Sequence, residues 1–171
     1  MSRFTTCTPS SMSRDEFVAA FADIYEHSPW VAEQTFDQGL TTEDDNIEQL
    51  HGRMAAVMGN ADKKAQLDLI NAHPDLAGKA AQRGELTEAS TSEQAGAGIS
   101  ECNAEEFERF TFLNNAYKEK FQFPFIMAVR GSNRHQILAA FEERIHNDYD
   151  TEFARAVKEI NKIAEFRLSA M

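Results

Sequence analysis

Apolar residues recur at intervals of three and four along most of this 171-residue chain, and little interrupts them. The sequence contains only eight glycines and four prolines, the residues that most often end helices and start turns. A stripe of this spacing buries one face of a helix, so the pattern predicts a single-domain, all-α helical bundle. The apolar stripes run from Phe17 to Tyr25, Ile47 to Met58, Phe107 to Phe121, Ile137 to Ile145 and Phe153 to Ala164.

The residues that flank these stripes predict where helices begin and end. Ser13 and Asn103 are expected N-caps, because their side chains can accept a backbone N–H. A helix over about Asp62 to Ala72 should end before Pro74, because proline disfavours helical geometry in the residue before it. The apolar run Phe123–Gly131 is short and bounded by proline and glycine, which favours an extended or irregular segment.

Charge and cysteine content exclude several classes of protein. The formal net charge is −11 at pH 7, and such a negative field repels nucleic acids and anionic membranes. Two cysteines, Cys7 and Cys102, are too few for a disulfide framework, so we expect ordinary thiols in a reducing cytoplasm. No apolar run approaches the roughly 20 residues that span a bilayer, and the first residues lack the apolar core of a signal peptide. We expect residues 1–13 to be flexible and residues 14–171 to form the helical domain.

The tripeptide His73-Pro74-Asp75 is the first of three places that depart from the pattern of apolar core and polar surface. The imidazole follows an apolar helix, and the proline restricts its backbone, so His73 should point in a fixed direction. Histidine is the side chain best suited to proton transfer near neutral pH. A histidine that caps helix-end carbonyls, with Asp75 capping the next segment, explains the same residues. The tripeptide alone favours that structural interpretation.

Ser90 and Glu93, three residues apart, make the second place. They predict a capping box, in which each side chain accepts a backbone N–H at a helix start. On its own this pattern favours a structural role. A helix N-terminus also attracts anions, and the small residues 95–98 would let a ligand approach closely. Capping and ligand binding are therefore compatible here.

Arg167 is the third place, because it falls in register with the apolar stripe of the last helix. Such an arginine either extends its charged end to solvent, which is the commoner outcome, or reaches an internal anion. His51 also lies on an apolar face, where a hydrogen-bonded core histidine is expected. The sequence contains no HExxH, CxxC, P-loop or GxGxxG motif, so nothing in it calls for a metal or an organic cofactor.

Five motifs follow one another across about residues 14–168. The motifs are Ser28-Pro29-Trp30-Val31-Ala32-Glu33, residues 69–78 around His73, Ser90 to Gly98, Phe123 to Gly131, and Ile160 to Leu168. In this order they resemble the 2-oxo-4-hydroxy-4-carboxy-5-ureidoimidazoline (OHCU) decarboxylase family. Two departures, Gln122 in place of an expected glycine and Asp37-Gln38-Gly39 in place of Arg-Pro-Phe, lie outside the positions the family uses for catalysis.

The resemblance implies about eight helices, a homodimer, and a cofactor-free, stereospecific decarboxylation of OHCU to (S)-allantoin in urate catabolism. It implies that His73 is the catalytic acid or base and that Glu93 is its essential partner. The only partner besides a second copy would be the small-molecule substrate, and no metal would take part. The residues implied to surround the substrate are Pro74, Ser90, Thr91, Ser92, Gln94, the backbone of Phe125, Ile126, Met127, Ala128 and Val129, and Arg167.

Two functions of other classes fit parts of the sequence. His-Pro-Asp is also the signature of J-domain co-chaperones, but that function needs a strongly basic helix before the tripeptide. The segment 61–72 instead carries two lysines against two aspartates. A helical interaction module without chemistry is the other alternative, and it would leave His73, Glu93 and Arg167 as unrelated surface positions.

Overall fold

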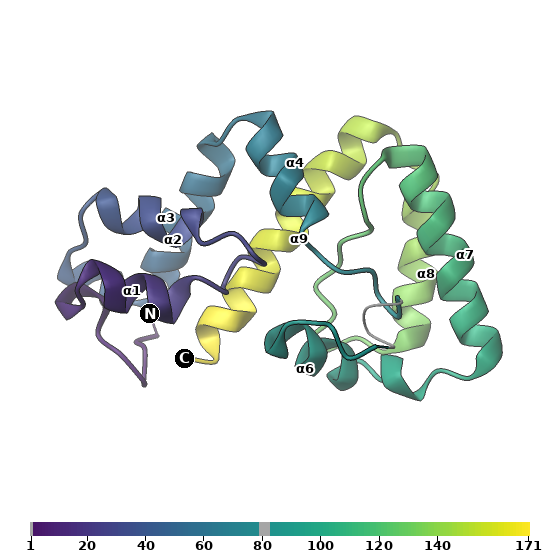
Figure 1. The fold of residues 1–171 in the computed structure, drawn as a ribbon, viewed down its shortest axis with the longest axis horizontal. Helices are drawn as coiled ribbons and strands as arrows, with labels where there is room; N and C mark the ends of the chain where they lie inside the picture. Colours follow the sequence, from purple (N-terminus) through teal and green to yellow (C-terminus); the bar gives the residue numbers. More distant parts are fainter. Residues whose placement is uncertain (1, 79–82) are drawn as a thin grey trace. The chain divides into compact units, whose positions relative to one another are not determined.

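Helices make up the regular secondary structure of this computed structural model, which describes residues 2–78 and 83–171 (Figure 1). Those residues contain eight α-helices and three short 3₁₀ helices, and within them the only β-type pairing is an isolated bridge between Arg3 and Asn46. The all-α prediction and the expected number of helices are confirmed. The α-helices are α1 (Arg14–Phe21), α2 (Trp30–Asp37), α3 (Ile47–Asn60), α4 (Lys63–Asn71), α6 (Glu88–Gly96), α7 (Ala104–Phe121), α8 (Arg134–Arg144) and α9 (Tyr149–Ser169); the 3₁₀ helices are η1 (Pro9–Ser11), η2 (Thr42–Asp45) and η3 (Ile99–Glu101).

The helical domain contains two compact units. Unit 1 comprises residues 2–72 together with Ile160–Met171, and unit 2 comprises His73–Glu159. Helix α9 contributes its first half to unit 2 and its second half to unit 1. None of the helices in the described ranges combines the length and apolar character that a bilayer crossing requires.

The predicted helix boundaries match the structure where local side chains set them. Ser13 and Asn103 each accept the N–H of the residue three positions later, and both form complete capping boxes. Asp62 caps α4, which ends at Asn71, before Pro74. Residues 123–131 form no helix, as their composition predicts.

Unit 1 is built on aromatic contacts between its first segments. Helix α1 packs against α2, which packs against α3. The Phe17 and Phe21 rings are fully buried, with centroids 4.5 Å apart, and Phe4 meets Phe21 edge-on at 5.6 Å. The backbone N–H groups of Thr5 and Thr6 donate to the Met171 carbonyl at 3.0 and 2.9 Å. These contacts attach the segment before α1 to the unit; the flexibility expected of residues 1–13 stays a prediction.

Tyr117 of α7 lies at the centre of an aromatic cluster in unit 2. Its ring centroid is between 4.5 and 5.9 Å from those of Phe121, Phe123, Phe125 and Phe141. Most of these contacts are edge-on, the arrangement that the ring quadrupole favours. The cluster ties the irregular segment 123–131 to α7 and α8.

A buried charged network adjoins this cluster. The Glu152 carboxylate is fully buried and accepts hydrogen bonds from the Tyr117 hydroxyl (2.6 Å), the Arg144 Nε (2.9 Å) and the Asn147 amide (3.1 Å). Arg144 Nη1 also donates to the Ile126 carbonyl at 2.6 Å. Burial, and then the bond to the Glu152 carboxylate, raises the pKa of the Tyr117 phenol above its ordinary value. The network therefore keeps Tyr117 as a neutral donor and holds Ile126 through its backbone.

Replacing Tyr117 by Phe should destabilise the protein by about 1–2 kcal/mol, because it removes a buried donor while the ring stays in place. Chemical denaturation followed by far-ultraviolet circular dichroism measures this. Lys64→Ala, which breaks the exposed Lys64–Asp68 pair, is the control and should change the free energy of unfolding by less than about 0.5 kcal/mol. Equal effects of the two substitutions would contradict a structural role for the network.

Candidate functional site

His73 begins unit 2 directly after α4. Its side chain is largely buried, with 9% of the residue exposed. Because α4 ends two residues earlier, the imidazole is carried by a turn rather than by a helix. The turn continues through Pro74 and Asp75 to Ala77, whose backbone adopts the left-handed region with a φ of +54°. The imidazole of a histidine on such a turn keeps a fixed orientation only if other residues hold the backbone of the turn in place.

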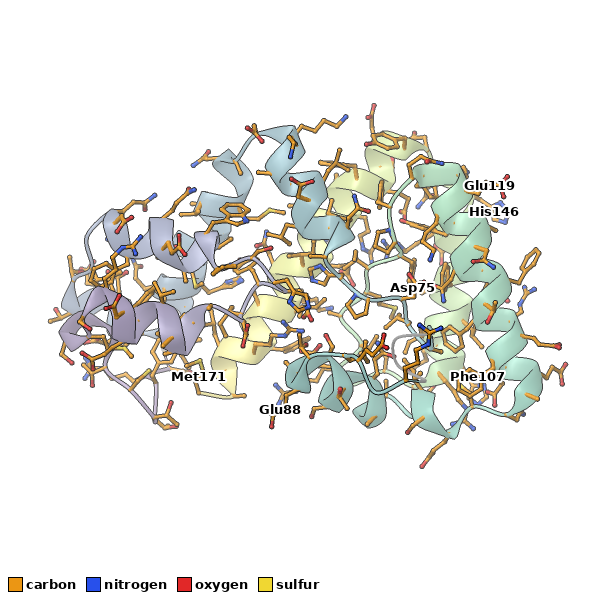
Figure 2. The ribbon with its side chains drawn as sticks, in the orientation of Figure 1. Asp75, Glu88, Phe107, Glu119, His146 and Met171 are labelled. Atoms are coloured by element: carbon orange, nitrogen blue, oxygen red, sulfur yellow. The ribbon has the colours of Figure 1, made fainter. Side chains whose placement is uncertain are left out.

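Gln94 of α6 holds the turn from one side. Its Oε1 accepts the N–H of Ala77 at 3.1 Å, and its Nε2 donates to the Asp75 carbonyl at 3.3 Å. The Gln94 side chain is buried, so the bond to Ala77 forms in the interior, whereas the bond to Asp75 is partly buried (Asp75 is labelled in Figure 2). An amide is the side chain that can both accept and donate in this way. The structure thus gives Gln94 a function in shaping the turn, and its contact with substrate stays a prediction.

Helix α7 holds the same turn from the other side. The buried Asn114 donates from Nδ2 to the Leu76 carbonyl at 2.9 Å, and Lys118 Nζ lies 2.6 Å from Asp75 Oδ2. Neither Asn114 nor Lys118 was predicted from the sequence as part of the site. Their signal was present only as polar residues within the amphipathic pattern of α7, which does not reveal the atoms they contact. Asp75 therefore pairs with a lysine of α7. Whether it also caps the next segment lies partly outside the described residues, because that segment includes residues 79–82.

The capping box predicted at Ser90 and Glu93 is wrong. Helix α6 begins three residues earlier, with Thr87 as its N-cap, and the Thr87 hydroxyl accepts the Ser90 N–H at 3.2 Å. Ser90 and Glu93 thus lie inside the helix, where residues three apart share one face. The Ser90 N–H is committed to Thr87, so it does not belong to an open anion-binding helix end.

The residues expected around the substrate on α6 fall on two sides of the helix. Ser90 and Gln94 are buried and Glu93 is partly buried, whereas Thr91 and Ser92 are exposed. The Thr91 hydroxyl donates to the Thr87 carbonyl within the same helix, at 2.9 Å. The interior face of α6 therefore carries Ser90, Glu93 and Gln94 together. Contact of Thr91 and Ser92 with substrate stays a prediction.

A cavity of about 280 Å³ adjoins Gln94 in unit 2. Its lining is mostly apolar and contains neither His73 nor Glu93. Among the described residues, its lining contains no Lys or Arg. The residues that line it are Ala77, Gly84, Leu86, Thr91, Gln94, Ala95, Ile99, Ser100 and Phe107.

The segment Phe125–Val129 is fixed by buried charged side chains from α8 and α9. Arg144 holds the Ile126 carbonyl, and its guanidinium lies 4.4 Å from the centre of the Phe125 ring. The Ala128 N–H donates to Glu159 Oε1 at 3.2 Å. Apart from the partly exposed Met127, the five residues are buried. Two of the backbone groups expected to face substrate therefore have partners within unit 2, and the contact of this segment with substrate stays a prediction.

Arg167 lies in unit 1, where its side chain is 7% exposed. Its Nη2 is 2.8 Å from Glu26 Oε2, and its Nη1 donates to the Asp23 carbonyl at 3.0 Å. Extension of the charged end to solvent, the commoner outcome, is therefore wrong for Arg167, and the alternative, pairing with an internal anion, is observed. Glu26 was missed because nothing local in the sequence marks it as the partner of a residue 141 positions away.

The remaining expectations concern histidines and metals. His51 Nε2 makes a 2.7 Å hydrogen bond with the Asn161 backbone oxygen, which confirms a satisfied histidine on that face. Residues 2–78 and 83–171 contain no group of three or more His, Cys, Asp or Glu side chains that could hold a metal ion.

Replacing Gln94 by Glu should destabilise the protein by about 1–3 kcal/mol, because a carboxylate can accept from Ala77 but cannot donate to the Asp75 carbonyl. Thermal denaturation of purified variants tests this. Gln66→Glu is the matched control: its amide also donates to a backbone carbonyl, that of Met58, but it is only partly buried and should cost less. A larger loss in the Gln66 variant would contradict the proposed function of Gln94 in the turn.

With this geometry in view, comparison with known proteins identifies the family. A sequence model of the OHCU decarboxylase family matches residues 10–169. The chain is 39% identical over 169 residues to the 2-oxo-4-hydroxy-4-carboxy-5-ureidoimidazoline decarboxylase of Haloferax volcanii, covering 99% of this chain and 96% of that protein. It is 38% identical over 171 residues to the protein of the same name from Halalkalicoccus jeotgali, covering 100% of this chain and 93% of that protein.

A solved structure agrees with the sequence comparisons. The crystal structure of an (S)-allantoin synthase superposes on this chain with a TM-score of 0.74 at 34% sequence identity. The match covers 95% of this chain but only 52% of that one, so this chain spans about half of the solved protein. The helices, the His-Pro-Asp turn and the extent of the matches lead to one conclusion: this chain belongs to the OHCU decarboxylase family.

Proposed function

We propose that this chain catalyses the decarboxylation of OHCU to (S)-allantoin in urate degradation. The observation that carries the proposal is the match to the OHCU decarboxylase family over residues 10–169, which includes His73 on its buried, doubly held turn. The co-chaperone hypothesis has no comparable support. The aspartate of its signature tripeptide is paired with Lys118 here, and the helix before it is not strongly basic.

The substrate carries a carboxylate and a hydroxyl on one ring carbon, next to a C=N bond. When the bond to the carboxylate carbon breaks, carbon dioxide leaves and the electron pair of that bond forms a double bond to the neighbouring ring carbon. The second electron pair of the C=N bond moves to its nitrogen, which takes up a proton. The hydroxyl then loses its proton to become a carbonyl, and the neighbouring ring carbon gains a proton. The ring itself accepts the electrons, so the reaction does not need the carbanion-stabilising cofactor that other decarboxylations use. We therefore propose a cofactor-independent reaction.

The protein has three tasks in this reaction: it binds one enantiomer, stabilises the developing charge, and directs a proton to one face of the ring. We assign the proton transfer to His73, at the ring hydroxyl or at the carbon that gains hydrogen. Glu93 orients the imidazole or the ring, and Arg167 holds substrate oxygens with its planar guanidinium. Pro74, the interior face of α6 and the segment Phe125–Val129 complete the substrate contacts.

The stereochemistry of the product is the decisive test. OHCU is generated from urate with the upstream enzymes, the protein is added, and circular dichroism follows the allantoin that forms. We expect a strong excess of (S)-allantoin, unaffected by exhaustive chelation. Racemic product at the rate seen without protein would overturn the proposed function.

In the same assay His73→Asn should lower turnover by about 10²–10⁴-fold, because a general acid or base typically contributes that much. The fold should remain, since asparagine is polar and the turn is held by Gln94 and Asn114. His135→Asn removes an exposed histidine of the same unit and should keep full activity. If a folded His73→Asn variant were as active as the control, the histidine would be structural only.

Glu93→Gln tests whether charge at this position serves the reaction. Because Glu93 lies inside α6 and caps nothing at its start, a loss of activity cannot come from a lost capping box. We expect a large fall in turnover with a nearly unchanged melting temperature. Glu88→Gln, an exposed position in the first turn of α6, is the control and should be fully active (Figure 2). Full activity of the Glu93 variant would remove it from the proposed site.

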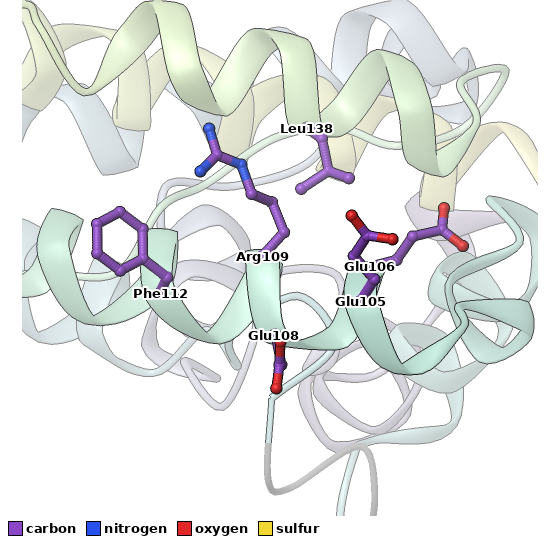
Figure 3. A pocket seen from close by; sticks show the side chains of 6 residues that line it. All are labelled: Glu105, Glu106, Glu108, Arg109, Phe112 and Leu138. Atoms are coloured by element: carbon purple, nitrogen blue, oxygen red, sulfur yellow. The ribbon is translucent and has the colours of Figure 1, made fainter.

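We also propose that the chain is a homodimer and that it resides in the cytoplasm. The support for an interface is Phe112 of α7, which is 63% exposed and is the one large hydrophobic side chain so exposed within residues 2–78 and 83–171. Figure 3 shows it beside Arg109 on the surface between α7 and α8. If α7 packs antiparallel on its copy with Phe112 against Ala116, then Arg109 faces Glu119 and Glu108 faces Lys120. The support for the cytoplasm is that both cysteines are free thiols.

Light scattering tests the interface. The wild-type protein should have twice the 19.2 kDa mass of one chain. Phe112→Ser should shift the population towards the monomer at low micromolar concentration, because an exposed aromatic anchor often dominates an interface. Lys64→Ser, at an exposed position of α4, should not. A Phe112 variant that remains fully dimeric would place the interface elsewhere, and a monomeric wild type would overturn the homodimer.

A further inference from the structure

We infer that Glu26 is a positioning residue, whose carboxylate fixes the plane of the Arg167 guanidinium for substrate binding. The inference rests on the proposed function, in which Arg167 holds substrate oxygens. Glu26 is 1% exposed and Arg167 is 7% exposed, so the pair forms in the interior of unit 1. Neither burying a carboxylate nor burying a guanidinium is favourable unless each is paired. The question is what the pair achieves beyond mutual neutralisation.

The turn that carries Glu26 is built to direct it inward. His27 has a φ of +47°, in the left-handed region that non-glycine residues rarely adopt, and its side chain is 64% exposed. The backbone N–H of Ser28 donates to the Tyr25 carbonyl at 3.1 Å, and the Ser28 hydroxyl donates to the Glu26 carbonyl at 2.9 Å. The buried Tyr25 donates from its hydroxyl to Asn161 Oδ1 at 2.6 Å, which attaches the turn to α9. The backbone places the His27 side chain towards solvent and is anchored through Tyr25. The Glu26 side chain between them therefore points into the interior of unit 1.

The contacts of Arg167 constrain its orientation rather than only its charge. One terminal nitrogen is bonded to the Glu26 carboxylate and the other to the Asp23 carbonyl. A guanidinium is planar, so two bonds from different nitrogens to two fixed acceptors define its plane. The acceptors belong to one short segment, 23–26, which Asn161 holds through Tyr25. The length of the Glu26 side chain therefore sets where the guanidinium lies.

Unit 1 contains a second ion pair with a buried carboxylate, and this pair serves as a comparison. Asp44 of η2 is fully buried and lies 2.7 Å from Arg53 Nε of α3. Its other oxygen accepts the N–H of Thr41, so it closes a capping box and its function is structural. A variant at Asp44 therefore loses a buried carboxylate of the same unit without touching Arg167.

Two substitutions separate orientation from charge. Glu26→Gln keeps the side-chain length and an acceptor for Nη2 but removes the charge. Glu26→Asp keeps the charge but withdraws the carboxylate by one carbon–carbon bond. If Glu26 positions Arg167, Glu26→Asp should raise the KM for OHCU about tenfold, the scale of one lost charge-assisted hydrogen bond. Glu26→Gln should lower the melting temperature more and leave the KM within about threefold of wild type.

The matched control is Asp44→Asn, which should lower the melting temperature and leave the KM unchanged. A merely structural function of Glu26 predicts the same behaviour as Asp44: both Glu26 variants less stable, neither altered in KM. That result overturns the inference. It is also overturned if Glu26→Gln raises the KM as much as Glu26→Asp does, because then charge rather than orientation matters.

A second readout does not depend on activity. The Nε–H resonance of Arg167, assigned by its loss in Arg167→Lys, should be sharp in the wild type and in Glu26→Gln. In Glu26→Asp it should shift and broaden as the guanidinium loses its fixed plane. An unchanged resonance overturns the inference even if the enzyme is active. A wild type that forms no (S)-allantoin overturns the proposed function instead, and the resonance still decides whether Glu26 orients Arg167.

Discussion

The hydrogen bonds from Arg144 to Glu152 and Ile126 are the contacts on which unit 2 depends. A guanidinium and a carboxylate can be buried among phenylalanines only when both are paired, and here the pair also engages a tyrosine hydroxyl and a backbone carbonyl. Few alternative arrangements of α7, α8 and α9 would satisfy all the hydrogen bonds of such a network. It thereby turns an apolar run with no regular structure into a segment of fixed path.

Polar side chains of helices also fix the turn that carries His73. Its irregular backbone is shaped by amide and ammonium groups from two helices, Gln94 on α6 and Asn114 with Lys118 on α7. Polar groups of regular elements thus order irregular segments in both places. In unit 1 the arrangement is reversed, since an irregular turn carrying Glu26 orients a helical residue, Arg167.

The sequence predicts features that depend on residues a few positions apart, such as helix caps. It does not predict contacts between residues that are far apart in the chain. Ser13 and Asn103 could be identified as caps because the atoms they bind lie three residues away. The cap of α6 was misplaced because several hydroxyl residues follow one another, and Thr87 competes successfully with Ser90. The pairing of Arg167 with Glu26 joins residues 141 positions apart, and no periodicity encodes that. The residues expected at the site could be identified as polar residues that interrupt apolar patterns and through the family resemblance. The residues that hold them in place are identified only by the structure.

The turn after α4 also affects which measurement shows that a refolded preparation of the protein is native. Its hydrogen bonds to Gln94, Asn114 and Lys118 join residues 17 to 43 positions apart in the sequence. The backbone hydrogen bonds of each helix instead join residues four positions apart. Contacts between distant residues cost more chain entropy to close than local ones. Helix content can therefore be restored in a preparation while His73 is not yet held. For this chain, a native circular dichroism spectrum reports the scaffold, and the buried state of one imidazole reports the site.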